Sequence, residues 1–440
     1  MTSSQSITHA RVLGIAVPIV ISNMTVPLQG IADTAVIGQI PDATPIAAVA
    51  VGAALITSLL WIFGFIRMGT AGMTAQAQGA GNRAEVAALL TRALLIGGAG
   101  GLLMIPLLGP IAVLGFSVSP ATEEVKSLAS GYMDIRILSA PAAVAVYGIN
   151  GWLGALERTR SMLILQLWIV SLNIALNALF VIGLDWGVEG VATATVISDW
   201  TGLVLGLWLC RKAFRNPAWR DWPRVFDRAR LRHMAVVNTD ILLRSLMLQT
   251  ITLSFIFYYS AGFGVVTLAA SQVLLHFIEV MAYALDGFAF AAESLVGQAF
   301  GAKAVGQLRR AVRLTSLWGF LSNLLFALGF ALFGGAIIDA MTKDPEVQQV
   351  ARLYLPWIVA TPLLGLPSWM LDGIFIGATR TRDMRNMMAV SAGVYFVAVT
   401  ALIPVWGGHG LWAALMIAYV TRAVLLALRY PALERAALVP

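Results

Sequence analysis

The chain has 440 residues, of which 59% are hydrophobic and only 12% are charged. A soluble domain carries about 25% charged residues, so this composition excludes an ordinary water-soluble protein. The net charge of +7 does not indicate a nucleic-acid-binding protein, because the basic residues follow a membrane-topology pattern described below.

Apolar segments long enough to cross a bilayer recur along the whole chain. A spanning helix needs about 20 mostly apolar residues, and these segments lack the alternation typical of spanning strands. The sequence therefore predicts an all-α polytopic membrane protein with twelve transmembrane helices in two repeated six-helix bundles. The helices are expected at residues 12–37, 44–66, 90–115, 130–153, 161–184, 188–210, 235–260, 266–292, 311–335, 350–376, 385–406 and 410–430.

The loops between these spans differ in charge. Connections after the second, fourth, sixth, eighth and tenth spans collect Lys and Arg, whereas the opposite connections hold few. Cytoplasmic loops are enriched in Lys and Arg. We therefore expect a multi-pass protein of the bacterial inner (plasma) membrane with both termini in the cytoplasm.

The two halves of the chain repeat each other. Residues 150–162 read NGWLGALERTRSM and residues 372–384 read DGIFIGATRTRDM, at an offset of 222. At an offset of 220, residues 187–190 match residues 407–410, and Gly81 matches Gly301. We expect an N-lobe at residues 1–212 with helices 1–6, a cytoplasmic linker at 213–234, and a C-lobe at 235–440 with helices 7–12. Parallel repeats of this kind are a transporter architecture, although they could also serve as a scaffold.

Asp33 is the clearest ionisable residue inside a predicted span of the first half. A carboxylate within the bilayer is costly and usually functional. The same span contains Pro18 and Pro27, which remove backbone donors and allow the helix to bend.

Four further polar residues lie in the fifth and sixth spans. Asn173 and Asn177 are one helical turn apart on one face, and Asp199 lies one turn beyond Thr195. Together with Asp33 they could hold a proton or a small hard cation. The alternative is that the amides and the hydroxyl only hold helices together.

The second half carries its own acids. Glu279, Asp286 and Glu293 recur at intervals of seven residues, with His276 three positions before the first. Seven residues are close to two helical turns, so these side chains are expected along one stripe. Residues proposed to line a substrate cavity are Tyr147, Asn150, Glu279, Asp286, Glu293 and Asp372, with packing as the alternative for the tyrosine.

Charge pairs are also expected within the bundle. Asp240 and Arg244 stand at i,i+4 and resemble a structural ion pair. Asp372 stands alone in its span, opposite Asn150 in the repeat. Arg136 and Arg422 could neutralise buried acids or reach toward an interface.

Several chemistries are not indicated. The four histidines are scattered without cysteine partners at metal spacing, and the one cysteine, Cys210, excludes an intrachain disulfide. No Gly-rich phosphate-binding loop is present, so an ion gradient is the expected energy source. We expect no enzymatic activity, no cofactor and no metal, apart from a possible Na⁺ at Asp33.

Several motifs together resemble the multidrug and toxic compound extrusion (MATE) family, within it the DinF-like branch, over essentially the whole chain. The segments that carry the resemblance are residues 31–38 (IADTAVIG), 187–196 (GVEGVATATV), 282–293 (AYALDGFAFAAE), 297–301 (GQAFG) and 377–384 (GATRTRDM). The resemblance implies two six-helix lobes around a central cavity that opens alternately to either side.

The resemblance also implies a cation site in the N-lobe. The family's first-span aspartate matches Asp33, its fifth-span Asn-x-x-x-Asp matches Asn173 and Asn177, and its sixth-span threonine matches Thr195. An amide therefore replaces the second acid at position 177. One carboxylate is enough for a proton but makes a poorer Na⁺ site, so proton coupling through Asp33 is favoured.

The sequence thus predicts a monomeric secondary exporter of small organic compounds, often cationic or amphipathic, coupled to inward cation movement by alternating access. Its partners are these compounds and membrane lipid, and no nucleic acid. Alternatives are a Na⁺-coupled exporter of the same fold, and a lipid-linked or glycan flippase of the wider superfamily. A flippase would be expected to show a basic cavity, whereas the buried charges here are mostly acidic. A membrane scaffold without transport is a further alternative.

Overall fold

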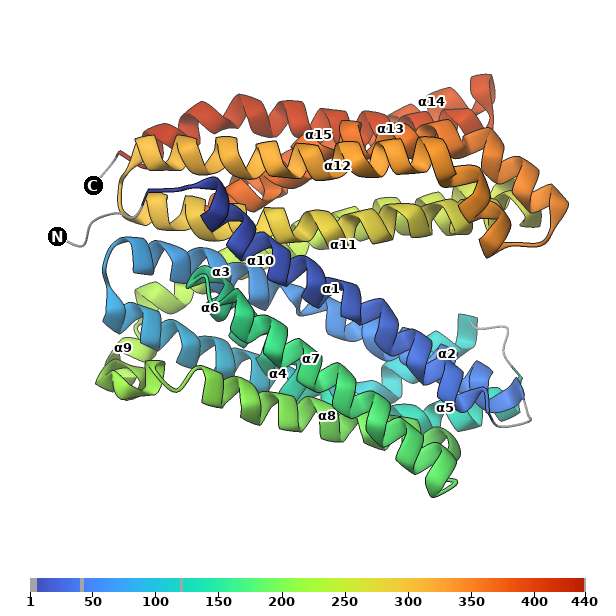
Figure 1. Ribbon diagram of the computed structural model, residues 1–440, viewed down its shortest axis with the longest axis horizontal. Coiled ribbons are helices and arrows are strands. Elements are labelled where there is room, and N and C mark those ends of the chain that lie inside the picture. Colours follow the sequence, from blue (N-terminus) through green and yellow to red (C-terminus); the bar gives the residue numbers. More distant parts are fainter. Residues whose placement is uncertain (1–5, 40–42, 119–121, 439–440) are drawn as a thin grey trace. The chain divides into compact units, whose positions relative to one another are not determined.

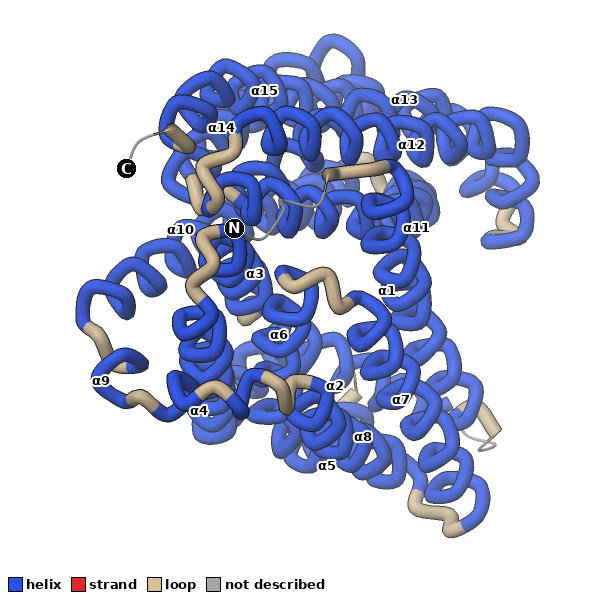
Figure 2. Tube along the Cα trace, turned by 60° about the vertical axis from the view of Figure 1, so that its left-hand side comes forward, coloured by secondary structure: helices blue, strands red, loops and turns tan. Residues whose placement is uncertain are grey.

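The computed structural model describes residues 6–39, 43–118 and 122–438, and this part of the chain forms helices and no strand. Twelve helices or helix pairs in it are long and apolar enough to cross a membrane. The predicted fold class is therefore confirmed, with only short loops between most helices (Figure 2).

The helices follow the chain as labelled in Figure 1. The first half forms α1 (His9–Ile37), α2 (Ala43–Ile62), α3 (Gly64–Gly79), α4 (Arg83–Val118), α5 (Glu123–Arg136), α6 (Ala140–Ala155), α7 (Thr159–Asn177) and α8 (Gly187–Leu209). After the short α9 (Trp222–Val225), the second half forms α10 (Arg228–Leu253), α11 (Val265–Gly301), α12 (Val305–Met341), α13 (Pro345–Gly377), α14 (Thr381–Trp406) and α15 (Gly408–Ala436).

Several helices extend beyond the spans expected from hydropathy. α4 begins at Arg83 rather than near residue 90, and α11 continues to Gly301 rather than ending near residue 292. Polar turns can continue a helix past its apolar segment, because water satisfies their side chains while the backbone bonds remain internal. The apolar segments locate the spans, and the helix ends lie outside them.

Packing divides the chain into two compact units. The N-terminal unit contains Ile21–Gln78 and Asn82–Met234, and the C-terminal unit contains Met1–Val20, Gly79–Gly81 and Ala235–Pro440. This division differs from the predicted lobes in three places. The chain up to Val20 and the turn Gly79–Gly81 belong with the second half, and residues 213–234, expected as a separate linker, belong to the N-terminal unit.

Side-chain contacts explain why the start of α1 belongs to the C-terminal unit. Arg11 donates to Gln298 Oε1 at 3.2 Å, and Trp318 Nε1 donates to His9 Nδ1 at 3.1 Å. Both partners lie on helices of the second half, α11 and α12.

The linker is tied to α4 by side chains that reach its backbone. Arg92 donates to the carbonyl oxygens of Val225 at 2.8 Å and Arg224 at 2.6 Å, and Thr91 donates to the carbonyl of Trp219 at 2.7 Å. Arg92 is 2% exposed. Charge-assisted hydrogen bonds at such burial are strong, so the linker forms part of the N-terminal unit.

The internal repeat is visible in the backbone. Left-handed residues, which are unfavourable for most side chains, recur at the offsets seen in the sequence. The pairs are Gly81 (φ 72°) with Lys303 (φ 54°), Glu157 (φ 58°) with Thr379 (φ 50°), and Gly187 (φ 54°) with Gly407 (φ 56°).

One detail of the predicted repeat is wrong. The sequence match of Gly81 with Gly301 is displaced by two residues, because Gly301 ends α11 as Gly79 ends α3. The offset of 222 residues therefore also holds at this turn.

Close helix crossings repeat at the same offset. A β-carbon at Gly151 would lie 2.3 Å from the carbonyl oxygen of Arg67, and one at Gly373 would lie 2.7 Å from that of Ala289. Each glycine and each carbonyl is 222 residues from its counterpart. Only glycine permits these backbones to approach so closely.

Each unit has its own apolar core. Ile56, Tyr132 and Val191 belong to the core of the N-terminal unit, while Phe255 and Trp412 belong to that of the C-terminal unit. The polar residues singled out in the sequence therefore lie on helices that are held by separate cores.

Candidate functional site

Asp33 lies in a polar cluster inside the N-terminal unit, formed by α1, α7 and α8. Asn177 Nδ2 donates to Asp33 Oδ1 at 2.5 Å and to Asn173 Oδ1 at 3.1 Å. Asn173 Nδ2 donates to Thr195 Oγ1 at 3.0 Å. The structure thus brings together four of the five residues predicted for the coupling site, and we call them the Asp33 cluster.

The members of the cluster other than Asp33 are buried. Asn173 and Asn177 are fully buried and Thr195 is 2% exposed, whereas Asp33 is half-buried. Buried polar groups are costly unless hydrogen-bonded. The two amides and the hydroxyl hydrogen-bond to one another, and Asp33 is the most exposed member of the cluster.

The hydrogen bonds of the cluster run outward from Asn177, toward Asp33 on one side and toward Asn173 and Thr195 on the other. The Thr195 hydroxyl donates to the carbonyl of Val191 at 3.0 Å, so its oxygen is available to accept from Asn173. Asn173 in turn accepts from Asn177, which also donates to Asp33. With the amides in these orientations, Asp33 only accepts, as an ionised carboxylate does.

One acceptor in the cluster has no partner. Asn177 Oδ1 is buried and makes no hydrogen bond with the described part of the chain. Asn177 is also the last α-helical residue of α7, and the helix continues as a π-helix over Ala178–Gly183. Such π-turns occur often at functional sites.

Pro18 and Pro27 both lie within α1, which runs as one helix from His9 to Ile37. The division between the two units falls after Val20, between the prolines.

Asp199, the fifth predicted coupling residue, lies in an ion pair with Arg136. Arg136 Nη1 is 3.1 Å from Asp199 Oδ2 and also donates to Ser139 Oγ. The arginine acts electrostatically on Asp33 as well. Asp199 is therefore paired with Arg136 and makes no hydrogen bond to the described members of the cluster.

The acids of α11 differ in burial. Glu279 is 62% exposed and lies 2.9 Å from His276 Nδ1, Asp286 is exposed, and Glu293 is only 3% exposed. The seven-residue spacing predicts a shared stripe but not how deeply each position is buried. Tyr147 and Asn150 are half-buried on α6.

The predicted pair of Asp240 with Arg244 is wrong. Asp240 instead lies 2.6 Å from Arg385 Nη1 and accepts from Thr381 Oγ1 at 3.1 Å. Arg244 reaches Asp372. The actual partners, Arg385 and Asp372, lie on other helices, α14 and α13. A buried charge needs a close counter-charge, and here other helices provide it instead of the i+4 neighbour.

Asp372 does not stand alone. Its Oδ2 lies 3.0 Å from Arg244 Nη1 and 3.7 Å from Arg422 Nη2. The proposed role of Arg136 and Arg422 in neutralising acids is confirmed. The sequence missed the Arg244 contact because 128 residues separate the partners, and no local spacing records it.

The buried charges are less acidic than expected. In the described chain they comprise three arginines and four acids, namely Arg92, Arg244, Arg422, Asp199, Asp240, Glu293 and Asp372. The described residues also contain no group of three or more His, Cys, Asp or Glu side chains that could hold a metal.

The chain matches known proteins along nearly its whole length. The MatE family model matches residues 18–179 and 241–402, one segment in each half. The chain is 39% identical over 415 residues to "DNA damage-inducible protein F" of Escherichia coli (strain K12), covering 94% of this chain and 90% of that protein. It is 22% identical to "Probable multidrug resistance protein NorM" of Shewanella oneidensis, covering 95% and 94%.

Among solved structures, the Vibrio cholerae MATE transporter VcmN in the bent form superposes with a TM-score of 0.87 at 19% identity, covering 98% of this chain and 97% of that chain. This likeness shows the fold.

Proposed function

Because the chain belongs to the MATE family of membrane transporters, we propose that it is a secondary exporter of small organic compounds driven by inward proton movement. Members of this family are transporters and not enzymes. Relatives that are named multidrug resistance proteins support a substrate class of cationic or amphipathic organic molecules. The distribution of Lys and Arg supports cytoplasmic termini.

The observation that carries the proposal is the single carboxylate of the Asp33 cluster. Asp33 forms no ion pair with a described residue, and its partner is the neutral amide of Asn177. An acid held by a neutral donor can take up a proton without leaving an arginine unpaired. This property suits a group that must change its charge in each transport cycle.

Protonation of Asp33 would reverse part of the hydrogen-bond chain. A protonated carboxyl needs an acceptor, and Asn177 presents a donor to it but has an unpaired Oδ1. Rotation of this amide would bring Oδ1 to Asp33 and withdraw Nδ2 from Asn173. Protonation of Asp33 on α1 would thus change hydrogen bonds on α7 and α8. Alternating access needs contacts of this kind, which differ between the protonated and the deprotonated state.

The ligand set favours a proton over Na⁺. A hard cation is bound by several oxygen atoms, usually with more than one carboxylate. Here the oxygens of Asn173 and Thr195 already accept hydrogen bonds, so Na⁺ would compete with the N–H donors for these oxygens. Without these two oxygens, only the Asp33 carboxylate and Asn177 Oδ1 remain as ligands, which is too few oxygen atoms for a good Na⁺ site.

The test uses purified protein in liposomes with ethidium as a fluorescent organic cation. Ethidium movement is followed under an imposed pH gradient or an imposed Na⁺ gradient. We expect transport with the pH gradient alone, and Asp33→Asn should reduce it to the level of protein-free liposomes. Asp134→Asn, an exposed acid in α5 of the same unit, is the matched control and should transport normally.

Other outcomes point elsewhere. Transport by Asp33→Asn under a pH gradient would refute the role of Asp33. Transport with Na⁺ alone would favour the Na⁺-coupled alternative. No transport under either gradient, together with gradient-independent movement of a labelled lipid-linked glycan, would favour the flippase.

A further inference from the structure

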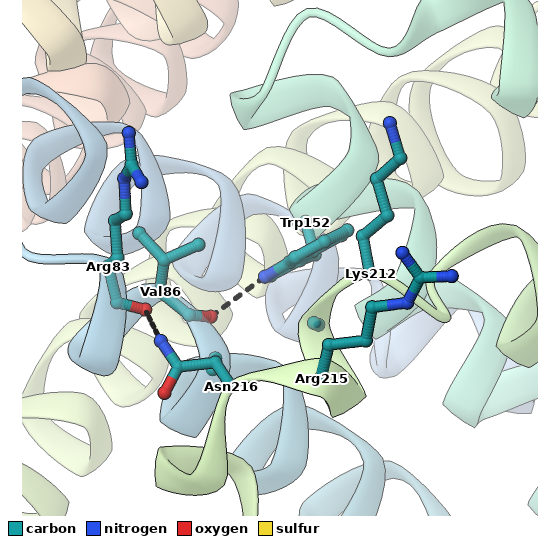
Figure 3. Close-up of a pocket in the computed structure, with 8 residues that line it drawn as sticks. Arg83, Val86, Trp152, Lys212, Arg215 and Asn216 are labelled. Carbon is teal, nitrogen blue, oxygen red and sulfur yellow. Dashed lines mark hydrogen bonds between the residues drawn. The ribbon is translucent and has the colours of Figure 1, made fainter.

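A basic pocket lies on the N-terminal unit where the linker meets α4 and α6 (Figure 3). Its volume is about 460 Å³, which is in the range of small-molecule sites. Its lining residues are Arg83, Val86, Ala87, Trp152, Lys212, Ala213, Arg215 and Asn216. No acidic residue is among them.

The walls of this pocket are fixed by hydrogen bonds. Trp152 Nε1 donates to the carbonyl of Val86 at 2.8 Å, and Asn216 Nδ2 donates to the carbonyl of Arg83 at 3.2 Å. Trp152 is 3% exposed. The indole therefore forms a rigid wall between α4 and the linker, as the dashed bonds in Figure 3 show.

Three exposed cations border the pocket and remain uncompensated. Arg83, Lys212 and Arg215 form no ion pair with a described residue, and Figure 3 shows Arg83 on one side of Trp152 and the other two on the opposite side. The nearby acid Glu85 is already engaged by Arg92 and by other arginines. The pocket thus carries three positive charges.

The pocket lies at the ends of three spanning helices. Arg83 begins the span of α4, Trp152 precedes the end of α6 by one turn, and Lys212 follows the end of α8. Trp208, in the last turn of α8, is 57% exposed and has the Arg211 guanidinium 4.0 Å from its ring. Exposed tryptophans beside basic residues mark the membrane–water interface.

We propose that this pocket binds the phosphate of an anionic membrane lipid headgroup. Three cations around a pocket without acids would select a phosphate-bearing anion, and basic pockets between spanning helices bind such headgroups. Because soluble phosphate would not depend on the interface, the position of the pocket at the end of α8, whose last turn carries the exposed Trp208, favours the lipid. The bound headgroup would join α4 to the linker and so reinforce the N-terminal unit.

The experiment measures the melting temperature of the purified full-length protein in detergent while phosphatidylglycerol or phosphatidylcholine is added. A ligand that binds the folded state raises the melting temperature. We expect phosphatidylglycerol to raise it and phosphatidylcholine to leave it unchanged. Native mass spectrometry of the same samples should show retained phosphatidylglycerol.

The test variant combines Arg83→Gln, Lys212→Gln and Arg215→Gln. Each basic group at such a surface strengthens anionic lipid binding by about fivefold, so we expect apparent affinity to fall by about 100-fold. The control combines Arg220→Gln, Arg228→Gln and Arg232→Gln, which removes the same charge from exposed positions outside the pocket. The control should keep most of the affinity.

Three results would overturn the proposal. Equal loss in the two triple variants would mean that the lipid responds to overall charge. Unchanged affinity in the pocket variant would mean that it binds elsewhere. Stabilisation by inorganic phosphate or glycerol phosphate to the same extent as by phosphatidylglycerol would identify a soluble phosphate site instead.

Discussion

The two units use the same helical positions for opposite purposes. In the N-terminal unit, the Asp33 cluster is a hydrogen-bonded polar group. At the repeat offsets, the equivalent positions in the C-terminal unit are Phe255, Tyr395, Val399 and Leu415, all of them members of one buried apolar core. Of these four pairs of described positions, the N-terminal members are polar and the C-terminal members belong to the apolar core, and Asp33 is the one acid among them.

At one position of α6 and α13 the acid is in the C-terminal unit instead. Where the N-terminal unit has Asn150, the C-terminal unit has Asp372, which contacts Arg244 and Arg422. Asp372 thus contacts two arginines, whereas the hydrogen-bond partner of Asp33 is the neutral amide of Asn177. Burial alone therefore does not make an acid a candidate for ion coupling. The charge of its nearest partner decides whether the acid is a candidate.

The largest expected effect on stability comes from removing the carboxylate of Asp372. Asp372→Asn removes the carboxylate charge that contacts two buried arginines, so we expect a loss of about 3–5 kcal/mol in unfolding free energy. Asp33→Asn removes no ion pair and should cost less than about 1 kcal/mol. Denaturation in mixed detergent micelles, followed by circular dichroism, compares the two variants. Equal losses would contradict the distinction between an acid paired with arginines and an acid paired with an amide.

A smaller effect is expected from two buried threonines, one in each unit. Thr195→Val leaves the Nδ2 donor of Asn173 without an acceptor, so we expect a loss of about 2 kcal/mol. The control is Thr315→Val in α12, since that buried hydroxyl bonds only to the carbonyls of its own helix and should cost less than about 1 kcal/mol. The same unfolding measurement serves. A larger loss at Thr315 would mean that the Asp33 cluster is not interdependent.

Asn177→Asp should change the coupling ion by adding a second carboxylate beside Asp33. Two adjacent carboxylates repel unless a cation or proton lies between them. We expect Na⁺ binding to strengthen by about tenfold and a Na⁺ gradient to drive ethidium export. Asn82→Asp, an acid added at an exposed position outside the cluster, is the control. If Asn177→Asp stays indifferent to Na⁺, the amide at position 177 does not determine ion choice.

The smallest effect concerns Cys210, a buried thiol that belongs to the N-terminal unit only. Burial raises the pKa of this thiol to about 12, against a weaker opposing effect of Arg158. The reactive thiolate is therefore scarce below that pH, and we expect almost no labelling by iodoacetamide at pH 8 in the folded protein.

Labelling of Cys210 then reports unfolding of one unit. In denaturant the Asp372→Asn variant should lose C-terminal structure before the thiol reacts. Rapid labelling of the native protein at pH 8 would contradict this burial.

The sequence predicts the fold well because spans and repeats are local or periodic signals. Apolar segments of membrane length stand out in one pass, and the motif at residues 150–162 recurs at 372–384. The start of α4 at Arg83 was not predictable from hydropathy, because a polar turn continues the helix. The place of residues up to Val20 depended on contacts of His9 and Arg11 with distant helices.

The candidate site was only partly predictable. The spacing of Asn173 and Asn177, with the family resemblance, identified a cluster that the structure assembles around Asp33. The direction of its hydrogen bonds and the open oxygen of Asn177 depend on side-chain orientation. The partners of Asp240 and Arg244 were predicted wrongly, because neighbours on one helix are visible in a sequence and contacts between helices are not.

The docking of the linker on α4 has a mechanical consequence. Since residues 213–234 belong to the N-terminal unit, the chain passes between the units only after Val20, around Gly79–Gly81 and after Met234. Any hinge between the units has to use these four passages of the chain, two of which flank Gly79–Gly81. The linker therefore moves with the N-terminal unit. An insertion near Asn216 would lengthen the linker without changing the range of motion between the two units.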